Sequence, residues 1–126
     1  MKKLAKLLSL TLVFVTAVFM LTACVPSDVE SAKEKMEEAG YFVSMPSITS
    51  SEVESGVVGK IKAQKLNAYS LPEDTIIALL FESSKQAKEY CESGGGWYDS
   101  LLTNTGHEGK WAYASHTEQA IKDFKA

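Results

Sequence analysis

The segment from Thr75 to Phe81 constrains the fold most, because its seven residues, TIIALLF, are apolar at almost every position. Successive side chains of a strand point to opposite faces, so an apolar run of this length predicts a strand that is covered on both faces. The segment is too short for a typical helix and lies between polar stretches. We therefore predict a central strand, around which the rest of the chain must build a sheet.

Three helices and three further strands are predicted around this strand. Each helix follows a serine that has Glu or Gln at the spacing of a capping box, namely Ser27, Ser83 and Ser115. The predicted helices cover residues 28–39, 84–93 and 117–125, and the predicted strands cover residues 41–45, 57–66, 75–81 and 110–114. The resulting order is α-β-β-β-α-β-α. It favours an α+β fold, a small two-layer domain with a mostly antiparallel four-stranded sheet and helices against one face.

Two connections are long. Residues 46–56 are rich in serine, and a single helical turn at 51–54 is an alternative to a plain loop. Residues 94–109 begin with three glycines and contain Leu101 and Leu102. A loop of this length in a small domain is functional, flexible or contains a short helix.

The first 23 residues are expected to lie outside the domain. Lys2, Lys3 and Lys6 precede a nearly continuous apolar run from Leu7 to Ala23, the order that a secretory signal peptide requires. An uncleaved membrane helix is the alternative, since the run is close to the shortest length that spans a bilayer. Cys24 follows directly and raises a second choice, because it could pair with Cys91 or carry a lipid.

The sequence Leu21-Thr22-Ala23-Cys24 resembles the lipobox of bacterial lipoproteins, and the abundance of lysine with no arginine fits a Gram-positive source. The resemblance implies a diacylglycerol thioether on Cys24 with added fatty acid, cleavage after Ala23, and residence on the outer face of the cell membrane. It divides the chain into a signal peptide (1–23), a lipidated N-terminus with a short tether (24–27) and one α+β domain (28–126). The domain itself resembles no named family.

Charge narrows the set of partners. A chain that begins at Cys24 keeps all sixteen acidic residues and ten of thirteen lysines, so its formal charge is about −6. An acidic surface argues against nucleic acid as a partner. It also leaves the anchor at Cys24 as the only expected attachment to anionic lipid.

No catalytic group, cofactor site or metal site is predicted. Cys91 lies on the apolar side of its predicted helix and is expected in the core. His107 and His116 have no ligand-spaced partners, and the glycines at 94–96 follow a helix, whereas a phosphate-binding loop precedes one.

The aromatic residues give the one candidate binding patch, formed by Trp97, Tyr98, Trp111 and Tyr113. Trp111 and Tyr113 share one face of their predicted strand, and Ala112 and Ala114 occupy the other, where a helix could approach closely. Exposed, these rings would bind an envelope protein, a peptide or a glycan; the alternative is that they close the core. The sequence thus favours a membrane-anchored, non-catalytic binding module. The alternatives are an envelope enzyme with an unrecognised active site, and a pheromone precursor that releases the signal-peptide segment Leu10–Val15.

Overall fold

The computed structural model describes residues 25–93 and 101–126. The chain forms an α+β domain, as predicted, with four helices and five strands in the described part. In chain order the elements are α2 (Val29–Glu38), β1 (Phe42–Ser44), α3 (Ser50–Glu54), β2 (Val57–Leu66), β3 (Pro72–Phe81), α4 (Ser84–Glu92), β4 (Asn104–Glu108), β5 (Trp111–Ser115) and α5 (Glu118–Lys125).

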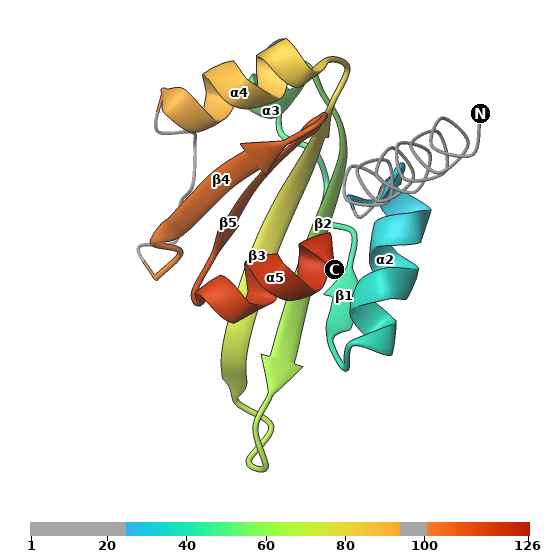
Figure 1. Ribbon diagram of the computed structural model, residues 1–126, viewed down its shortest axis with the longest axis vertical. Helices are drawn as coiled ribbons and strands as arrows, with labels where there is room; N and C mark the ends of the chain where they lie inside the picture. The colour runs from blue at the N-terminus through green and yellow to red at the C-terminus, as the bar shows by residue number, and fades with distance from the viewer. Residues whose placement is uncertain (1–24, 94–100) are drawn as a thin grey trace, which may run out of the picture.

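The five strands form one antiparallel sheet in the order β1-β2-β3-β5-β4 (Figure 1). The predicted central strand is confirmed: β3 is the middle strand, between β2 and β5. Of the side chains of β3, Ile76 and Ala78 belong to one core cluster and Leu79 and Phe81 to another. β3 therefore carries buried apolar side chains on both faces, as its sequence predicts.

One face of the sheet is covered by α2 and α5 (Figure 1). The core on this face is continuous from α2 across the sheet to α5; it contains Ala32, Met36, Tyr41, Ile61, Ala63, Ile76, Ala78, Trp111, Tyr113, Ala120 and Phe124. α2 approaches β2 closely because Gly59 has no side chain. A Cβ atom at Gly59 would come within 2.3 Å of Cγ2 of Val29.

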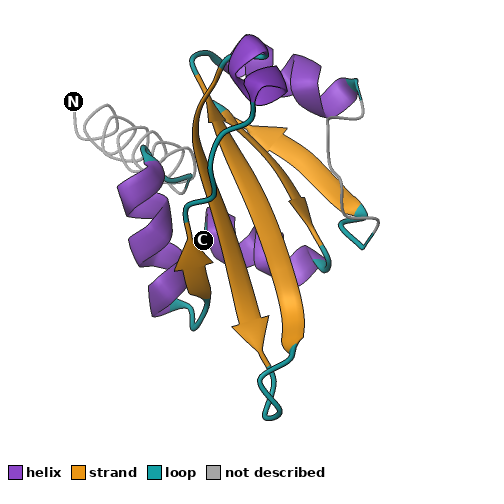
Figure 2. Cartoon of the chain, turned by 180° about the vertical axis from the view of Figure 1, so that it is seen from behind, coloured by secondary structure: helices purple, strands orange, loops and turns teal. Residues whose placement is uncertain are grey.

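Within residues 25–93 and 101–126, the helices on the opposite face are α3 and α4, which cover one end of it (Figure 2). Ala87 of α4 packs there with Ala112 of β5, and Phe81 contacts the Tyr90 ring at 5.3 Å between centroids. The small side chain of Ala112 allows the close approach of a helix, as the sequence suggested. The prediction that helices cover one face only is wrong. The apolar residues of both β3 and β5 alternate between two covered faces.

β4 is the strand that the prediction missed. Its sequence, NTGHE, has no apolar alternation, because β4 is an edge strand whose side chains are largely exposed or half-exposed. Its ladder with β5 runs from Asn104–Ser115 to Glu108–Trp111. Part of the predicted long loop is thus a strand. The alternative helical turn near residue 51 is confirmed as α3.

A hairpin joins β2 to β3 and projects beyond the helices at the end of the sheet opposite α3 and α4 (Figure 1). Asn67 organises its turn: Oδ1 accepts hydrogen bonds from the backbone N–H groups of Tyr69 at 2.8 Å and Leu71 at 3.1 Å. Ser70 adopts a left-handed conformation with φ of 61°. The Tyr69 side chain is 85% exposed, so the hairpin tip presents an aromatic ring to solvent.

Candidate functional site

Two of the four aromatic residues in the predicted patch are buried. Trp111 is 1% exposed and Tyr113 is 3% exposed. The Trp111 ring contacts the ring of Phe124 edge-on at 5.2 Å, and the Tyr113 ring lies 5.8 Å from it. The proposed exposed patch is therefore wrong for these two residues, because α5 lies over the face that they share. The other two residues of the predicted patch, Trp97 and Tyr98, fall outside the described residues.

Trp111 instead holds the beginning of the domain. Its indole Nε1–H donates a hydrogen bond of 2.6 Å to the backbone carbonyl of Pro26. Val25 and Val29 pack against the same core. The predicted tether at residues 24–27 is thus docked on the domain at Val25 and Pro26. Cys24, the predicted lipid site, directly precedes this contact and lies outside the described residues.

On the α3–α4 side, the half of the sheet that none of the described helices covers forms the best candidate for a binding surface (Figure 2). We call it the open face and define it by Phe42, Lys62, Gln64, Thr75 and His116. In the sheet register, Gln64 lies opposite both Phe42 and Thr75, so these three side chains share one face. The backbone N–H of His116 donates to the carbonyl of Thr75 and extends the row past β3.

Phe42 is the notable member of the open face, because its ring is 67% exposed although it lies on a strand. Leu101, on the other side of the row, is 61% exposed. Exposed apolar side chains that add nothing to a core often mark binding surfaces when they gather together. Phe42 follows Tyr41, which is buried, and the alternation of the strand turns the Phe42 ring outwards.

A pocket of about 180 Å³ lies beside this row, lined by Gln64, Pro72, Thr75, Leu101, Leu102 and His116. The Gln64 side chain donates a long hydrogen bond of 3.5 Å to the Thr75 hydroxyl. The pocket thus combines an amide, a hydroxyl and an imidazole with apolar walls. This mixture can orient the backbone of a bound segment by hydrogen bonds while the walls contact its apolar side chains.

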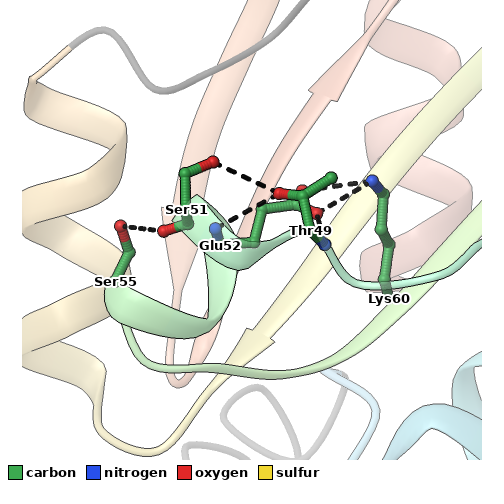
Figure 3. Close-up of polar contacts among 5 residues, drawn as sticks. All are labelled: Thr49, Ser51, Glu52, Ser55 and Lys60. Atoms are coloured by element: carbon green, nitrogen blue, oxygen red, sulfur yellow. Dashed lines mark hydrogen bonds and ion pairs between the residues drawn. The ribbon is translucent and has the colours of Figure 1, made fainter.

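The two lysines that β2 turns to this side of the sheet differ in their partners. Lys60 lies beneath α3, where Nζ is 3.1 Å from both carboxylate oxygens of Glu52 (Figure 3). For Lys62, no salt bridge is present among the described residues. The side chains of Lys60 and Glu52 are only 15% and 7% exposed, so this pair serves the fold. Lys62 is the charge that the open face can offer to a partner.

The neighbours of Glu52 lower its pKa. Burial by itself would raise the pKa of Glu52, but hydrogen bonds from the Thr49 backbone N–H and the Lys60 ammonium hold this pKa below its ordinary value. The Thr49 N–H donates to Glu52 Oε1 at 2.9 Å, and the Glu52 N–H donates to the Thr49 hydroxyl at 3.3 Å. This is a complete capping box at the start of α3. The helical turn was one of two alternatives for this segment, and its capping box was not predicted.

Another polar cluster is partly buried at the opposite face. Tyr41 donates a hydrogen bond of 2.7 Å to Asp123 of α5, and burial together with this carboxylate raises the Tyr41 pKa. Asp74, 7% exposed, accepts hydrogen bonds from the Thr75 N–H and the Thr117 hydroxyl. These bonds attach α5 to β3 and to the segment after α2. The Tyr41–Asp123 and Thr117–Asp74 hydrogen bonds each join two segments of the fold, which favours a structural role.

The remaining candidates for chemistry lie apart from one another. His107 is on the exposed edge strand β4, and His116 borders the pocket. Among residues 25–93 and 101–126, no three potential metal ligands come together. Cys91 packs beside the core of α4, and its pKa is raised by burial. Its predicted place at the core side of the helix is confirmed, although the residue is partly exposed.

No helix in the described part of the chain is long and apolar enough to cross a membrane. The apolar segment 7–23 lies outside the described residues. In three comparisons, the chain matches no protein-family model, no curated protein and no solved structure.

Proposed function

We propose that this protein is a bacterial lipoprotein, anchored through Cys24 to the outer face of the cell membrane, whose domain binds an envelope partner without catalysing a reaction. The proposal for the anchor rests on the match of Leu21-Thr22-Ala23-Cys24 to the lipobox after a lysine-led apolar segment. Two acyl chains on a diacylglycerol hold a protein to a bilayer stably, whereas one chain does so only marginally.

The exposure of Phe42 carries the proposal for binding. A phenylalanine with 67% of its surface in water, on the same sheet face as a pocket, adds little to the stability of the fold. The row from Phe42 to His116 crosses four strands, a width of about 14 Å at the usual spacing between strands. An extended peptide of about four residues has this length. The open face therefore fits a short apolar segment of an envelope protein.

The anchor is tested by changing Cys24 to Ala. The expected result is a precursor that keeps residues 1–23, carries no lipid and is lost from the mature membrane-bound pool. The N-terminal mass and metabolic labelling with an alkyne fatty acid measure this directly. Normal processing and unchanged fractionation of the Cys24→Ala chain would contradict the proposal.

The binding surface is tested with a photo-crosslinking residue in place of Phe42 in the anchored protein, in its own membranes. The expected result is a discrete crosslinked partner that is lost when Gln64→Lys is added to block the open face. A crosslinker in place of Tyr69, equally aromatic but on the hairpin tip, is the matched control. A crosslink that persists with Gln64→Lys, or a polysaccharide in place of a protein, would contradict a peptide-binding open face.

The enzyme alternative has no grouping of described residues in its favour. The pheromone alternative concerns Leu10–Val15, outside the described residues. Mass spectrometry of the culture medium tests it, because a released peptide would contain this segment.

A further inference from the structure

The described chain begins at a defined place on the domain. Pro26 accepts the Trp111 indole hydrogen bond at 2.6 Å, and Trp111 is 1% exposed. Val25 packs on the same core, so the chain is held from its first described residue onward. Cys24 is joined to Val25 by one peptide unit, about 3.8 Å between Cα atoms. A lipid on Cys24 would therefore have almost no flexible chain between it and the domain.

This place lies at one end of the sheet, which we call the Gly59 end. Val29 packs against Gly59 of β2, and Trp111 pairs in register with Leu80 of β3. α2 runs from the Gly59 end towards Lys65, whose side chain lies 3.8 Å from the Cβ position of Gly40 after the helix. The α2 N-terminus and the start of β2 are therefore neighbours (Figure 1).

Two exposed valines, Val53 and Val58, lie near the Gly59 end. Val58 adjoins Gly59 on β2 at a break in the register and is 53% exposed. Val53 lies in α3, just before the turn that leads into β2. Its backbone carbonyl accepts a hydrogen bond of 3.0 Å from the Gly56 N–H, and its side chain is 58% exposed. Val25 and Val29 are partly buried at the same end. Val58 therefore offers exposed apolar surface beside Gly59, and Val53 offers it on the α3 side of the same end of the sheet.

The hairpin tip lies at the far end of the same strand. From Gly59 to Leu66, β2 advances by seven residues, about 23 Å at the usual rise of a strand. The turn at residues 67–71 lies beyond Leu66. The exposed ring of Tyr69 is therefore separated from the Gly59 end by almost the whole length of the domain.

We propose that the Trp111–Pro26 contact fixes the orientation of the anchored domain, with the Gly59 end and its valines Val53 and Val58 against the lipid surface and the β2–β3 hairpin pointing away from it. The occupant of the valine surface is the outer leaflet, because the chain enters the domain there with no slack. This inference rests on the proposed lipid anchor. It adds a membrane-contact surface, and it places the open face, near the hairpin, at a distance from the bilayer.

The test uses the lipidated protein, purified from membranes and reconstituted in vesicles whose headgroups carry a nitroxide quencher. In a Cys91→Ala background, a fluorophore is attached at Val58→Cys or, in a matched chain, at Tyr69→Cys. Both positions are exposed, and neither contributes to the core. Because the quencher acts at short range, we expect strong quenching of the fluorophore at position 58 and little quenching of the fluorophore at position 69. Equal quenching at the two positions, or stronger quenching at position 69, would overturn the orientation.

Two further chains test the contact itself. Ten Gly/Ser residues inserted between Cys24 and Val25 would span about 17 Å on average, so the difference between positions 58 and 69 should disappear. Trp111→Phe keeps the ring in the core but removes the N–H donor, and should reduce the same difference. Persistence of the full difference in both chains would show that the contact does not set the orientation. Co-sedimentation with vesicles is measured in parallel. A chain that fails to sediment contradicts the anchor, whereas one that sediments without the difference contradicts the orientation only.

Discussion

At the scale of a residue, Trp111 shows that the exposure of a side chain depends on distant parts of the chain. Its alternation with Ala112 places it correctly on one strand face, but the sequence of β5 does not say which face a helix covers. In the structure the ring packs on Phe124, and its N–H reaches Pro26, 85 positions earlier in the chain. A contact between such distant residues leaves no local pattern, which is why sequence analysis could place the ring on a face but not decide its exposure.

Glu52 gives the first prediction at this scale. Glu52→Gln removes the charge that neutralises Lys60, whose side chain is only 15% exposed. Leaving this largely covered ammonium without its partner should lower the free energy of unfolding at pH 7 by about 1–3 kcal/mol. Urea denaturation of the native and Glu52→Gln chains measures the loss.

The same substitution should also change the response to acid. The Glu52 pKa is lower in the folded domain than its ordinary value of 4.5, so the stability it contributes is present above pH 4.5 and is lost as the pH falls through the folded pKa. The Glu52→Gln chain should therefore lose less stability between pH 5 and acid than the native chain. Glu54→Gln, an exposed neighbour on α3, is the control and should stay within about 0.5 kcal/mol of native. Equal acid sensitivity of the Glu52→Gln and native chains would refute this account.

At the scale of elements, the strongly patterned segments were predictable and the short polar ones were not. β2 was predicted with its observed bounds, and Ser83 caps α4 as expected, with its hydroxyl accepting the Gln86 N–H at 3.3 Å. The other two caps are wrong by one or two positions. Asp28 caps α2, and α5 begins after Thr117, because the Ser115 hydroxyl donates to the Thr117 carbonyl. The polar alternation of β2 is typical of an edge or a half-exposed strand, and the second alternative is the observed one: β2 is internal, and Lys60, Lys62 and Gln64 are half-exposed on one face.

The docking of α2 on β2 gives the second prediction. Gly59→Ala would place a Cβ atom 2.3 Å from Cγ2 of Val29, so the helix or strand must shift. Overpacking of this kind costs about 1–3 kcal/mol. Val29→Ala in the same chain removes the opposing methyl groups, so the double variant should be more stable than Gly59→Ala alone. Thermal and urea unfolding of the native chain, both single variants and the double variant measure this coupling.

A double variant no more stable than Gly59→Ala would mean that the strain lies in the strand and not against the helix. Gly109→Ala is unsuitable as a control because Gly109 has a φ of 57°, which any side chain would strain. Val58→Ala is suitable, since Val58 is exposed on the same strand. It should remain close to native stability.

At the scale of the whole molecule, the described helices cover the two faces of the sheet unequally: one face serves the core, and part of the other is open to a partner. Two helices complete the core on one face, and two more cover only one end of the other face (Figures 1 and 2). The number of helices was nearly predictable from capping and periodicity. Their distribution over two faces was not, since it depends on the crossover from β3 through α4 to the β4–β5 hairpin.

The third prediction compares two phenylalanines. Phe42→Ser on the open face should change the free energy of unfolding by about 0.5 kcal/mol or less, because its ring is 67% exposed. Phe124→Ala, fully buried between Trp111 and Tyr113, should cost about 3–5 kcal/mol. Chemical denaturation of both chains tests the contrast. A large loss for Phe42→Ser would assign Phe42 to the fold and remove the main support for the open face as a binding surface.

The contact between Pro26 and Trp111 also has a consequence for the order of folding. Pro26 is near the beginning of the chain, and its partner lies on β5, 85 residues later. The contact can form only when both residues are present. The N-terminal segment therefore cannot dock until nearly the whole chain has been synthesised and β5 has paired with β3. The N-terminal segment at Val25 and Pro26 therefore docks only after β5 is in place, and under the proposed lipid anchoring this order would give processing enzymes time to act before the contact forms.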